Sequence, residues 1–205
     1  SKIIKIKKNS IKTKLNYIKN KLFLTQGNIQ NLSFVFAIIK KLNLNTKKTL
    51  NTINNFKGLK FRQEIIFKAK NLTIINDSKA TSFSSSENIL KSLKNVYWIL
   101  GGIPKKGDKF QMTRKECNSF KAYIFGNNKS FFIKNLRNKL AIQNFKNLKS
   151  ALKKVINDIR LSKSTINHKT ILFSPSAASF DSFRNFEDRG ENFNRLVQKL
   201  NLRKI

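Results

Sequence analysis

A short apolar run leads directly into a polar loop at Leu72-Thr73-Ile74-Ile75-Asn76-Asp77-Ser78-Lys79, and this junction indicates the fold class. A continuous apolar run of this length is too short for a helix and is typical of a strand that a parallel sheet buries on both faces. Three further runs of the same kind follow, at residues 96–100, 122–125 and 170–173. The sequence therefore predicts at least four buried parallel strands.

Helical patterns fill the chain between and after these runs. Ser84, with Glu87 three residues later, predicts a capping box for a helix through residues 89–93. Residues 144–161 and 182–200 also place apolar side chains at helical spacing. Strands that alternate with helices predict an α/β fold with a doubly wound, mostly parallel sheet.

Each predicted strand leads into a small or polar loop. The loops are residues 76–79, 101–102, 126–127 and 174–176. In open α/β sheets ligands bind beyond the carboxyl ends of the strands, where helix N-termini and loop amides converge. We therefore expect a ligand site at this edge, of a kind that fits an anion or a ribose.

The chain before Gly58 has a different pattern. Apolar positions between Ile29 and Leu42, Val35 among them, fall at helical spacing and predict an amphipathic helix, and a shorter helix should run through residues 50–53. In residues 1–24 short apolar groups stand between lysines and indicate edge strands and turns. Gly58 interrupts the pattern, so we divide the chain into residues 1–57 and 58–205.

The formal charge of +33 would ordinarily indicate a polyanionic partner such as nucleic acid. The lysines, however, are spread over almost the whole length and accompany an excess of Asn, Ile and Phe, which a biased genome composition explains equally well. We expect no specific nucleic-acid binding, since no recognition module is present in the sequence.

The remaining composition argues against several other kinds of site. Cys117 is the single cysteine and His168 the single histidine, so neither an internal disulfide nor a His/Cys zinc cluster can form. His168 lies in a polar stretch, and we expect it to be exposed and non-catalytic. The sequence shows no signal peptide and no membrane-spanning apolar run. We therefore expect a cytoplasmic protein without a membrane partner.

Three segments together resemble one known family. The first segment combines Gly58-Leu59-Lys60-Phe61-Arg62 with Asn76-Asp77-Ser78-Lys79-Ala80-Thr81. The second is Gly101-Gly102-Ile103-Pro104-Lys105-Lys106-Gly107-Asp108. The third is Ser174-Pro175-Ser176-Ala177-Ala178-Ser179-Phe180-Asp181, which continues to Asn185-Phe186-Glu187-Asp188-Arg189-Gly190. Their order and spacing are similar to those of the Mur ligase family, and within it of the members that add D-glutamate. The resemblance is strong after residue 56 and weak before it.

The resemblance implies an ATP-dependent acid–amino-acid ligase of peptidoglycan synthesis, and hence of cell-wall biogenesis, cell shape and cell division. Its substrates would be UDP-N-acetylmuramoyl-L-alanine, D-glutamate and ATP, its cofactor Mg²⁺, and its state monomeric. Residues 1–57 would be the end of the central ATPase domain. Residues 58–205 would be the Rossmann-like C-terminal domain, which binds the incoming amino acid.

On the same resemblance, Arg62 contacts an ATP phosphate and Asp77 the ribose hydroxyls. Both roles suit the side chains, since a guanidinium forms a planar charged fork for phosphate oxygens and a carboxylate accepts hydrogen bonds from hydroxyls. Asn28 falls near the end of a weaker match, in which Thr25 and Gly27 replace the family's Gly and His, and it is the expected adenine contact.

The D-glutamate carboxylates are assigned to Thr81, Lys105, Ser179 and Phe186. Lys105 would supply charge and the two hydroxyls directional hydrogen bonds. For Phe186 the residue pattern leaves two interpretations open, a wall of the pocket or a core position on the helix of residues 182–200. Lys79 belongs to the motif without a role of its own. Ser174 and Ser176 are expected to be caps or turn residues.

The ligase interpretation leaves parts unaccounted for. No Gly-x-x-x-x-Gly-Lys-Ser/Thr loop, the cradle for ATP phosphates, is present, and the chain begins with Ser1. We therefore expect a fragment that is inactive alone, with the phosphate loop and most Mg²⁺ ligands upstream. The alternatives are another Mur-type or folylpolyglutamate-type amino-acid ligase and a basic nucleic-acid-binding module. Lysines clustered on one face would favour the nucleic-acid-binding module. Convergence of Asp77, Lys105 and Ser179 would favour the ligase.

Overall fold

The computed structural model describes residues 11–24, 26–162 and 168–202. The chain divides into two compact units, Ser1–Gly58 and Leu59–Ile205. Each unit has its own hydrophobic core. Within the described ranges, none of the helices is long and apolar enough to span a membrane.

The described residues of the first unit form helices joined by turns and loops, without a strand. It contains α1 (Lys12–Leu15), a short 3₁₀ helix (Lys21–Leu24), α2 (Gln26–Lys41) and α3 (Thr46–Asn55), and the last two confirm the two predicted helices. Its core collects Ile11, Ile18, Leu32, Phe36, Ile39 and Ile53. Val35, which the spacing placed on the core-facing stripe, is 41% exposed, so that part of the prediction is wrong.

The edge strands expected in residues 1–24 are also wrong where the structure describes them, although residues 16–17 do form a turn. Residues 1–10, with the apolar pair Ile3-Ile4, lie outside the described residues. Lys21–Leu24 forms the 3₁₀ helix instead of a strand. The physical reason is packing, because the ring of Phe23 lies 5.6 Å from that of Phe56 and the side chain joins the helical core.

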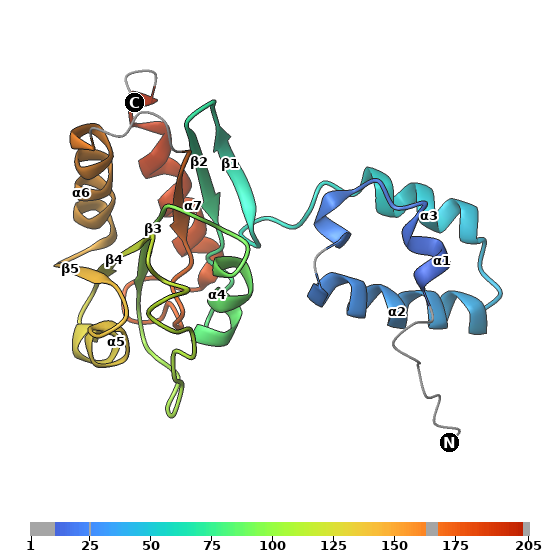
Figure 1. The fold of residues 1–205 in the computed structure, drawn as a ribbon, viewed down its shortest axis with the longest axis horizontal. Helices are drawn as coiled ribbons and strands as arrows, with labels where there is room; N and C mark the ends of the chain where they lie inside the picture. The colour runs from blue at the N-terminus through green and yellow to red at the C-terminus, as the bar shows by residue number, and fades with distance from the viewer. Residues whose placement is uncertain (1–10, 25, 163–167, 203–205) are drawn as a thin grey trace. The chain divides into compact units, whose positions relative to one another are not determined.

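The second unit is built on a six-stranded sheet in its described residues. The strands are β1 (Glu64–Lys68), β2 (Leu72–Asn76), β3 (Val96–Gly101), β4 (Phe120–Phe125), β5 (Ala141–Phe145) and β6 (Lys169–Phe173). Their order is β1-β2-β6-β3-β4-β5 (Figure 1), and every neighbouring pair is parallel except β1 with β2. All four predicted strands are confirmed.

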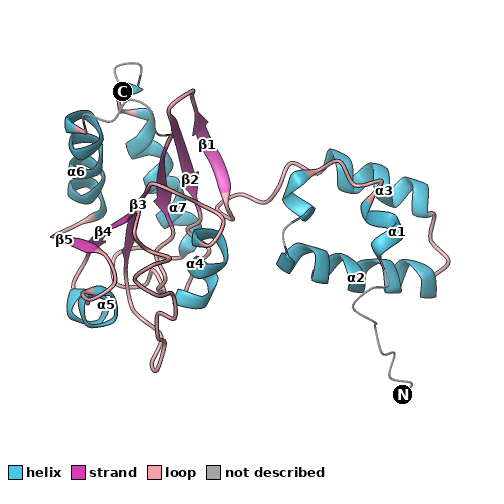
Figure 2. Ribbon diagram, viewed as in Figure 1, coloured by secondary structure: helices cyan, strands magenta, loops and turns pink. Residues whose placement is uncertain are grey.

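Helices cover both faces of this sheet (Figure 2). On one face α4 (Phe83–Leu90) and α5 (Lys129–Leu136) pack with Ile75, Trp98 and Leu172, and on the other α6 (Leu148–Leu161) and α7 (Phe186–Gln198) pack with their strand neighbours Ile74, Tyr97 and Ile171. Because successive side chains of a strand point to opposite faces, each buried strand needs apolar residues at every position. The doubly wound α/β prediction is confirmed.

Two local predictions fail. The cap of α4 is Ser82, whose hydroxyl accepts a hydrogen bond from the Ser85 N–H at 3.3 Å, and not the predicted Ser84. Glu87 is buried instead, and its carboxylate accepts a hydrogen bond from the Gln111 N–H. Its side chain therefore ties α4 to the loop that follows β3. In addition, the helices expected at residues 144–161 and 182–200 begin later, because residues 144–145 belong to β5 and α7 starts only at Phe186.

Candidate functional site

Three loops meet at the carboxyl edge of the sheet, because β2, β6 and β3 are parallel neighbours in that order. The Asp77 N–H donates to the Phe173 carbonyl at 2.7 Å and thereby joins the loop after β2 to the end of β6. Ile103 and Ala178 exchange two backbone hydrogen bonds of 2.9 Å and join the loop after β3 to the loop after β6. Segments far apart in sequence are thus held side by side.

Gly102 permits this second junction. Its φ is +128°, and a Cβ atom at this position would lie 2.3 Å from the Ala178 carbonyl oxygen. An L side chain cannot occupy that space without moving the loop of Ala178. The glycine therefore sets the close approach of the loops that carry Lys105 and Ser179.

Asp77 is the most strongly perturbed carboxylate of this edge. It is 4% exposed, its Oδ1 accepts from the Gln63 N–H at 3.1 Å, and its Oδ2 accepts from the Ser174 hydroxyl at 2.8 Å. Burial raises the pKa of Asp77 from 3.8 to about 6, although the hydrogen bonds from Ser174 and Gln63 and the charge of Arg62 lower it. The side chain therefore joins the segments of Gln63 and Ser174 to the loop after β2.

A cluster of buried serines continues behind Asp77. The Ser86 hydroxyl lies 2.7 Å from those of both Ser174 and Ser176, and Trp98 Nε1 donates to the Ser174 carbonyl at 2.8 Å. Ser174 and Ser176 are fully buried and Ser176 has a φ of +57°. These contacts agree with structural roles in the turn for both serines.

Lys79 and Phe186 lie against each other across the edge. The Lys79 ammonium stands 3.7 Å from the centroid of the Phe186 ring, within cation–π range. The Ser78 hydroxyl donates to the Phe186 carbonyl at 2.8 Å. Phe186 is half-buried and is the first residue of α7, so it contacts the loop after β2 and is not a core residue like Phe193.

Thr81, Lys105 and Ser179 stand on the three loops with their polar atoms unengaged. Thr81 and Lys105 are exposed and Ser179 is 3% exposed. Among the contacts of the described residues, none of the three side chains has a hydrogen-bond or ion-pair partner, and none is bonded to another of the three. One ammonium and two hydroxyls therefore remain available to a ligand at this edge.

The two other nucleotide residues are placed less fully. Arg62 is exposed and close enough to Asp77 for its charge to lower the pKa of that carboxyl. Asn28 is half-buried in α2 of the first unit, so its role at the adenine stays a prediction. No group of three His, Cys, Asp or Glu residues that could hold a metal ion such as Mg²⁺ occurs in the described part of the chain.

Arg189 lies in the third motif but has no role among the predicted site residues. It is fully buried on α7, its Nε donates to the Ser78 hydroxyl at 3.1 Å, and its Nη2 donates to the Ser78 carbonyl at 2.8 Å. A signal existed, because Arg189 falls on the same helical stripe as the buried Phe193 and Val197. A charged residue on an apolar stripe is uncommon and needs partners.

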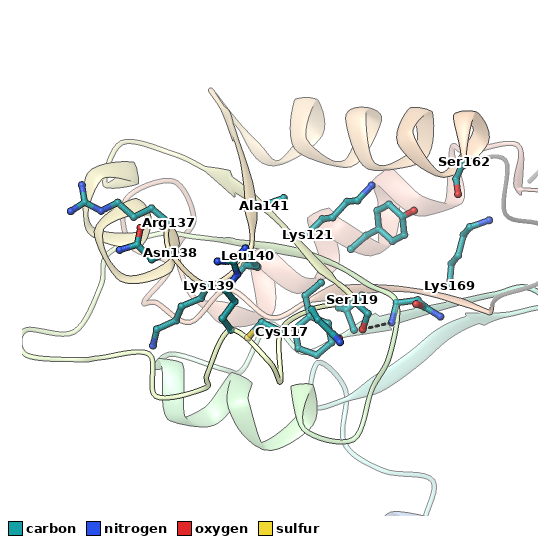
Figure 3. A pocket seen from close by; sticks show the side chains of 16 residues that line it. Cys117, Ser119, Lys121, Arg137, Asn138, Lys139, Leu140, Ala141, Ser162 and Lys169 are labelled. Carbon is teal, nitrogen blue, oxygen red and sulfur yellow. Dashed lines mark hydrogen bonds between the residues drawn. The ribbon is translucent and has the colours of Figure 1, made fainter.

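A separate hollow of about 880 Å³ opens at the opposite, amino-terminal edge of the strands. Its lining includes Tyr97, Lys121, Lys139, Ala141 and Lys169, and Figure 3 shows lysines reaching it from different strands and loops. None of the predicted site residues lines it. We take the carboxyl edge as the candidate site, because the motif side chains lie on its loops and none of them lines the hollow.

His168 is exposed, as predicted, and its ring nitrogens lie 2.8 Å from the Thr73 hydroxyl and 3.0 Å from the Lys70 carbonyl. Cys117 is buried, and burial raises the pKa of its thiol to about 11. A thiol of this kind is not a ready nucleophile at neutral pH.

Comparison with known proteins supports one family. No protein-family model matches the chain. Three curated proteins, each named UDP-N-acetylmuramoylalanine–D-glutamate ligase, are similar to it. That of Wolbachia sp. subsp. Brugia malayi (strain TRS) is 37% identical over 174 residues, 85% of this chain and 34% of the relative. That of Rickettsia felis is 35% identical over 197 residues, which cover 95% of this chain and 42% of the relative. That of Prochlorococcus marinus (strain MIT 9312) is 36% identical over 179 residues, which cover 84% of this chain and 37% of the relative.

A solved structure shares the fold. The crystal structure of UDP-N-acetylmuramate–alanine ligase from Thermotoga maritima matches 85% of this chain and 38% of its own with a TM-score of 0.55 and 16% identity. This chain spans about a third to two fifths of the length of the curated relatives it matches. From the three motifs, the sheet that brings them together and these relatives, we conclude that the chain belongs to the Mur ligase family.

Proposed function

We propose that this chain is part of an ATP-dependent ligase that adds D-glutamate to UDP-N-acetylmuramoyl-L-alanine in the cytoplasm. In this proposal residues 58–205 bind the incoming amino acid, and residues 1–57 belong to the end of the ATP-binding domain. The observation that carries the proposal is the convergence of Thr81, Lys105 and Ser179, all without a partner in the described structure, on three joined loops.

The three side chains suit the chemistry of D-glutamate. The substrate carries two carboxylates, which need donors, and an amine, which must stay free to attack. Lys105 would form a charge-assisted hydrogen bond, and the two hydroxyls would donate to the remaining carboxylate oxygens. Phe186 would close one side, and its N–H, in the first turn of α7 where backbone donors have no partner within the helix, would be a further donor.

Asp77 and Arg62 form the nucleotide side in this proposal. The carboxylate oxygens of Asp77 each accept one protein hydrogen bond and keep a further lone pair, which a ribose hydroxyl can use. The exposed guanidinium of Arg62 can reach a phosphate and also keeps Asp77 more acidic than burial alone would. Loop contacts between Asp77 and Ser174 would then couple the nucleotide and amino-acid sides.

The work of these residues is positioning. In such a ligase ATP phosphorylates the acceptor carboxylate and leaves as ADP. The D-glutamate amine then attacks the acyl phosphate, displaces phosphate and loses a proton to form the amide. Holding both carboxylates of D-glutamate leaves its amine as the group that faces the acceptor, and such orientation can account for much of a ligase's rate. We propose that Mg²⁺ is held by residues outside this chain and that the enzyme acts as a monomer.

The test is a titration of the chain with D-glutamate, followed by NMR. Shifts should concentrate on residues 77–81, 102–105 and 178–186, and L-glutamate should bind more weakly. Lys105→Met should weaken D-glutamate binding roughly tenfold or more, because a charge-assisted hydrogen bond contributes about 1.5–3 kcal/mol. Lys106→Met, which removes an equal charge from the next residue, is the control and should change binding less than about twofold. Equal effects of the two variants would reject the site.

A further inference from the structure

The guanidinium of Arg189 is buried at the point where the three site loops and α7 meet. Beyond its two bonds to Ser78, its Nη1 is buried and has no hydrogen-bond partner among the described residues. A Cβ atom built on Gly102 would lie 3.2 Å from this Nη1, so the group abuts the loop that carries Lys105. Arg189 thus forms hydrogen bonds to the loop of Lys79 and packs against the loop of Lys105 without bonding to it.

The charge of Arg189 is not neutralised by an ion pair. None of the ion pairs among the described residues includes Arg189. The acidic group that faces it is Asp181, two residues after Ser179, whose Oδ2 is also buried without a hydrogen-bond partner in the described structure. That oxygen lies against Gly126, where a Cβ atom would be 3.2 Å away. The charge of each group makes it easier for the other to stay ionised in its buried position. The two groups do not, however, form an ion pair in the described structure.

A buried charge without a bonded counter-ion is uncommon, because removing an ion from water is costly. At neutral pH Arg189 nevertheless stays charged, since burial lowers its pKa only to about 10. A positive charge held in a low-dielectric position attracts anions more strongly than a solvated lysine does. A ligand with one more carboxylate would therefore gain more from Arg189 than from the many exposed basic residues of this chain.

We propose that Arg189 is a positioning and specificity-determining residue that makes this edge selective for a dicarboxylic amino acid over its neutral amide. Its bonds to Ser78 fix the loop of Lys79 and Thr81, and its charge favours the second carboxylate. This inference rests on the proposed function and adds the residue that selects the substrate's side-chain charge.

The test compares D-glutamate with D-glutamine, which has the same shape and one charge fewer, in NMR titrations of the full 205-residue chain. The ratio of the two affinities is the readout, because a purely structural role would weaken both ligands equally. Arg189→Gln should lower the preference for D-glutamate by about fivefold or more. Arg189→Lys keeps the charge without the planar fork, and should weaken both ligands but retain most of the preference.

Two further variants keep the test decisive. Arg184→Gln removes the same charge from the same segment, where the side chain is 88% exposed, and should leave the ratio within about twofold. Asp181→Asn removes the opposing charge and should raise the preference for D-glutamate by about threefold, which also covers the case that Arg189→Gln does not fold. The inference is overturned if the affinity ratio is unchanged in both Arg189→Gln and Asp181→Asn. If Arg189→Gln does not fold, an unchanged ratio in Asp181→Asn alone overturns it. In either case the proposed function would still stand. Absence of D-glutamate binding by the unaltered chain would refute both.

Discussion

The ammonium of Lys79 lies 3.7 Å from the centre of the Phe186 ring, although the two residues are 107 positions apart in the sequence. This contact joins the loop after β2 to the start of α7, where the Ser78 hydroxyl also bonds to the Phe186 carbonyl. Phe186 thus contacts the loop after β2 and lies outside the buried core clusters, which favours the interpretation of this residue as a wall of the proposed pocket. Its role toward D-glutamate stays a prediction.

A double-mutant cycle should detect this contact. Lys79→Met and Phe186→Leu should show a coupling free energy of about 0.5–1 kcal/mol in urea unfolding, the range for exposed cation–π pairs. The control cycle pairs Phe186→Leu with Lys106→Met and should be additive within about 0.3 kcal/mol. Coupling of equal size in both cycles would mean that the Lys79 contact does not stabilise the fold.

Asp77 should make the stability of the protein depend on pH. The pKa of Asp77 is about 6 in the folded state against an ordinary 3.8, so the folded protein binds the proton more tightly than the unfolded chain does. Its contribution is therefore full below pH about 4 and is lost as pH rises through about 6. The loss amounts to roughly 3 kcal/mol, at about 1.4 kcal/mol per pKa unit.

The variant Asp77→Asn isolates this term. The difference in unfolding free energy between Asp77→Asn and the unaltered protein should move in favour of the variant by about 2–3 kcal/mol between pH 4 and 7. Urea titrations at several pH values measure it, and the other titrating groups cancel in the difference. A difference that is constant with pH would show that Asp77 is not perturbed by burial.

The strands were predictable because each carries its own signal. In the four predicted strands an apolar side chain is needed on both faces, and residues 96–100 and 122–125 read as unbroken runs. The two edge strands escaped prediction. β5 is partly exposed and includes Gln143 and Asn144, and β1 alternates irregularly at a bulge between Ile65 and Phe67. Edge strands bury less of each face, so their sequences are less constrained.

The site was predictable only as far as the motifs reach. Asp77, Lys105 and Ser179 each follow a predicted strand, and this was enough to predict that they lie at one edge of the sheet. The reason is that the carboxyl ends of parallel strands lie at the same edge. Burial and pairing were not predictable from the pattern. The partner of Glu87 is a backbone N–H 24 residues away, and the partner of Arg189 is Ser78, 111 residues away. Contacts between residues so far apart depend on tertiary packing and produce no local sequence pattern from which they could be predicted.

Two glycines of the same loop should respond differently to alanine. At Gly102 a Cβ atom would lie 2.3 Å from the Ala178 carbonyl oxygen, whereas at Gly107 nothing lies within 4 Å. Both have positive φ, which costs an L residue about 1–2 kcal/mol. Gly107→Ala should lose only that amount in urea unfolding, and Gly102→Ala should lose at least about 3 kcal/mol because the Ile103–Ala178 junction must open. Equal losses would contradict the role of Gly102 in joining the loops.

Nucleic-acid binding by the chain should be weak and strongly dependent on salt. The charge of +33 is spread along the sequence, so binding should come mostly from counter-ion release. Fluorescence anisotropy with short duplexes should show affinity falling by at least about a hundredfold between 50 and 200 mM salt, with no preference among sequences. Sequence-selective binding that persists at 200 mM would support the nucleic-acid-binding alternative.

The division between an amino-acid side and a nucleotide side can be tested in a chimaera in which this chain replaces the matching segment of the Rickettsia felis ligase. Lys105→Met should raise the KM for D-glutamate roughly ten- to a hundredfold and leave the KM for ATP nearly unchanged. Ser179→Ala should act in the same direction but less, because a neutral hydrogen bond contributes about 1 kcal/mol.

Asp77→Ala should give the opposite pattern in the same chimaera, with a raised KM for ATP and a D-glutamate KM close to the original. It will also lower stability, because Gln63 and Ser174 lose their acceptor. Loss of stability alone, however, reduces the amount of active enzyme and leaves both KM values unchanged. The crossed pattern therefore separates binding from folding, and a rise of both KM values in every variant would show that the two sides are not distinct.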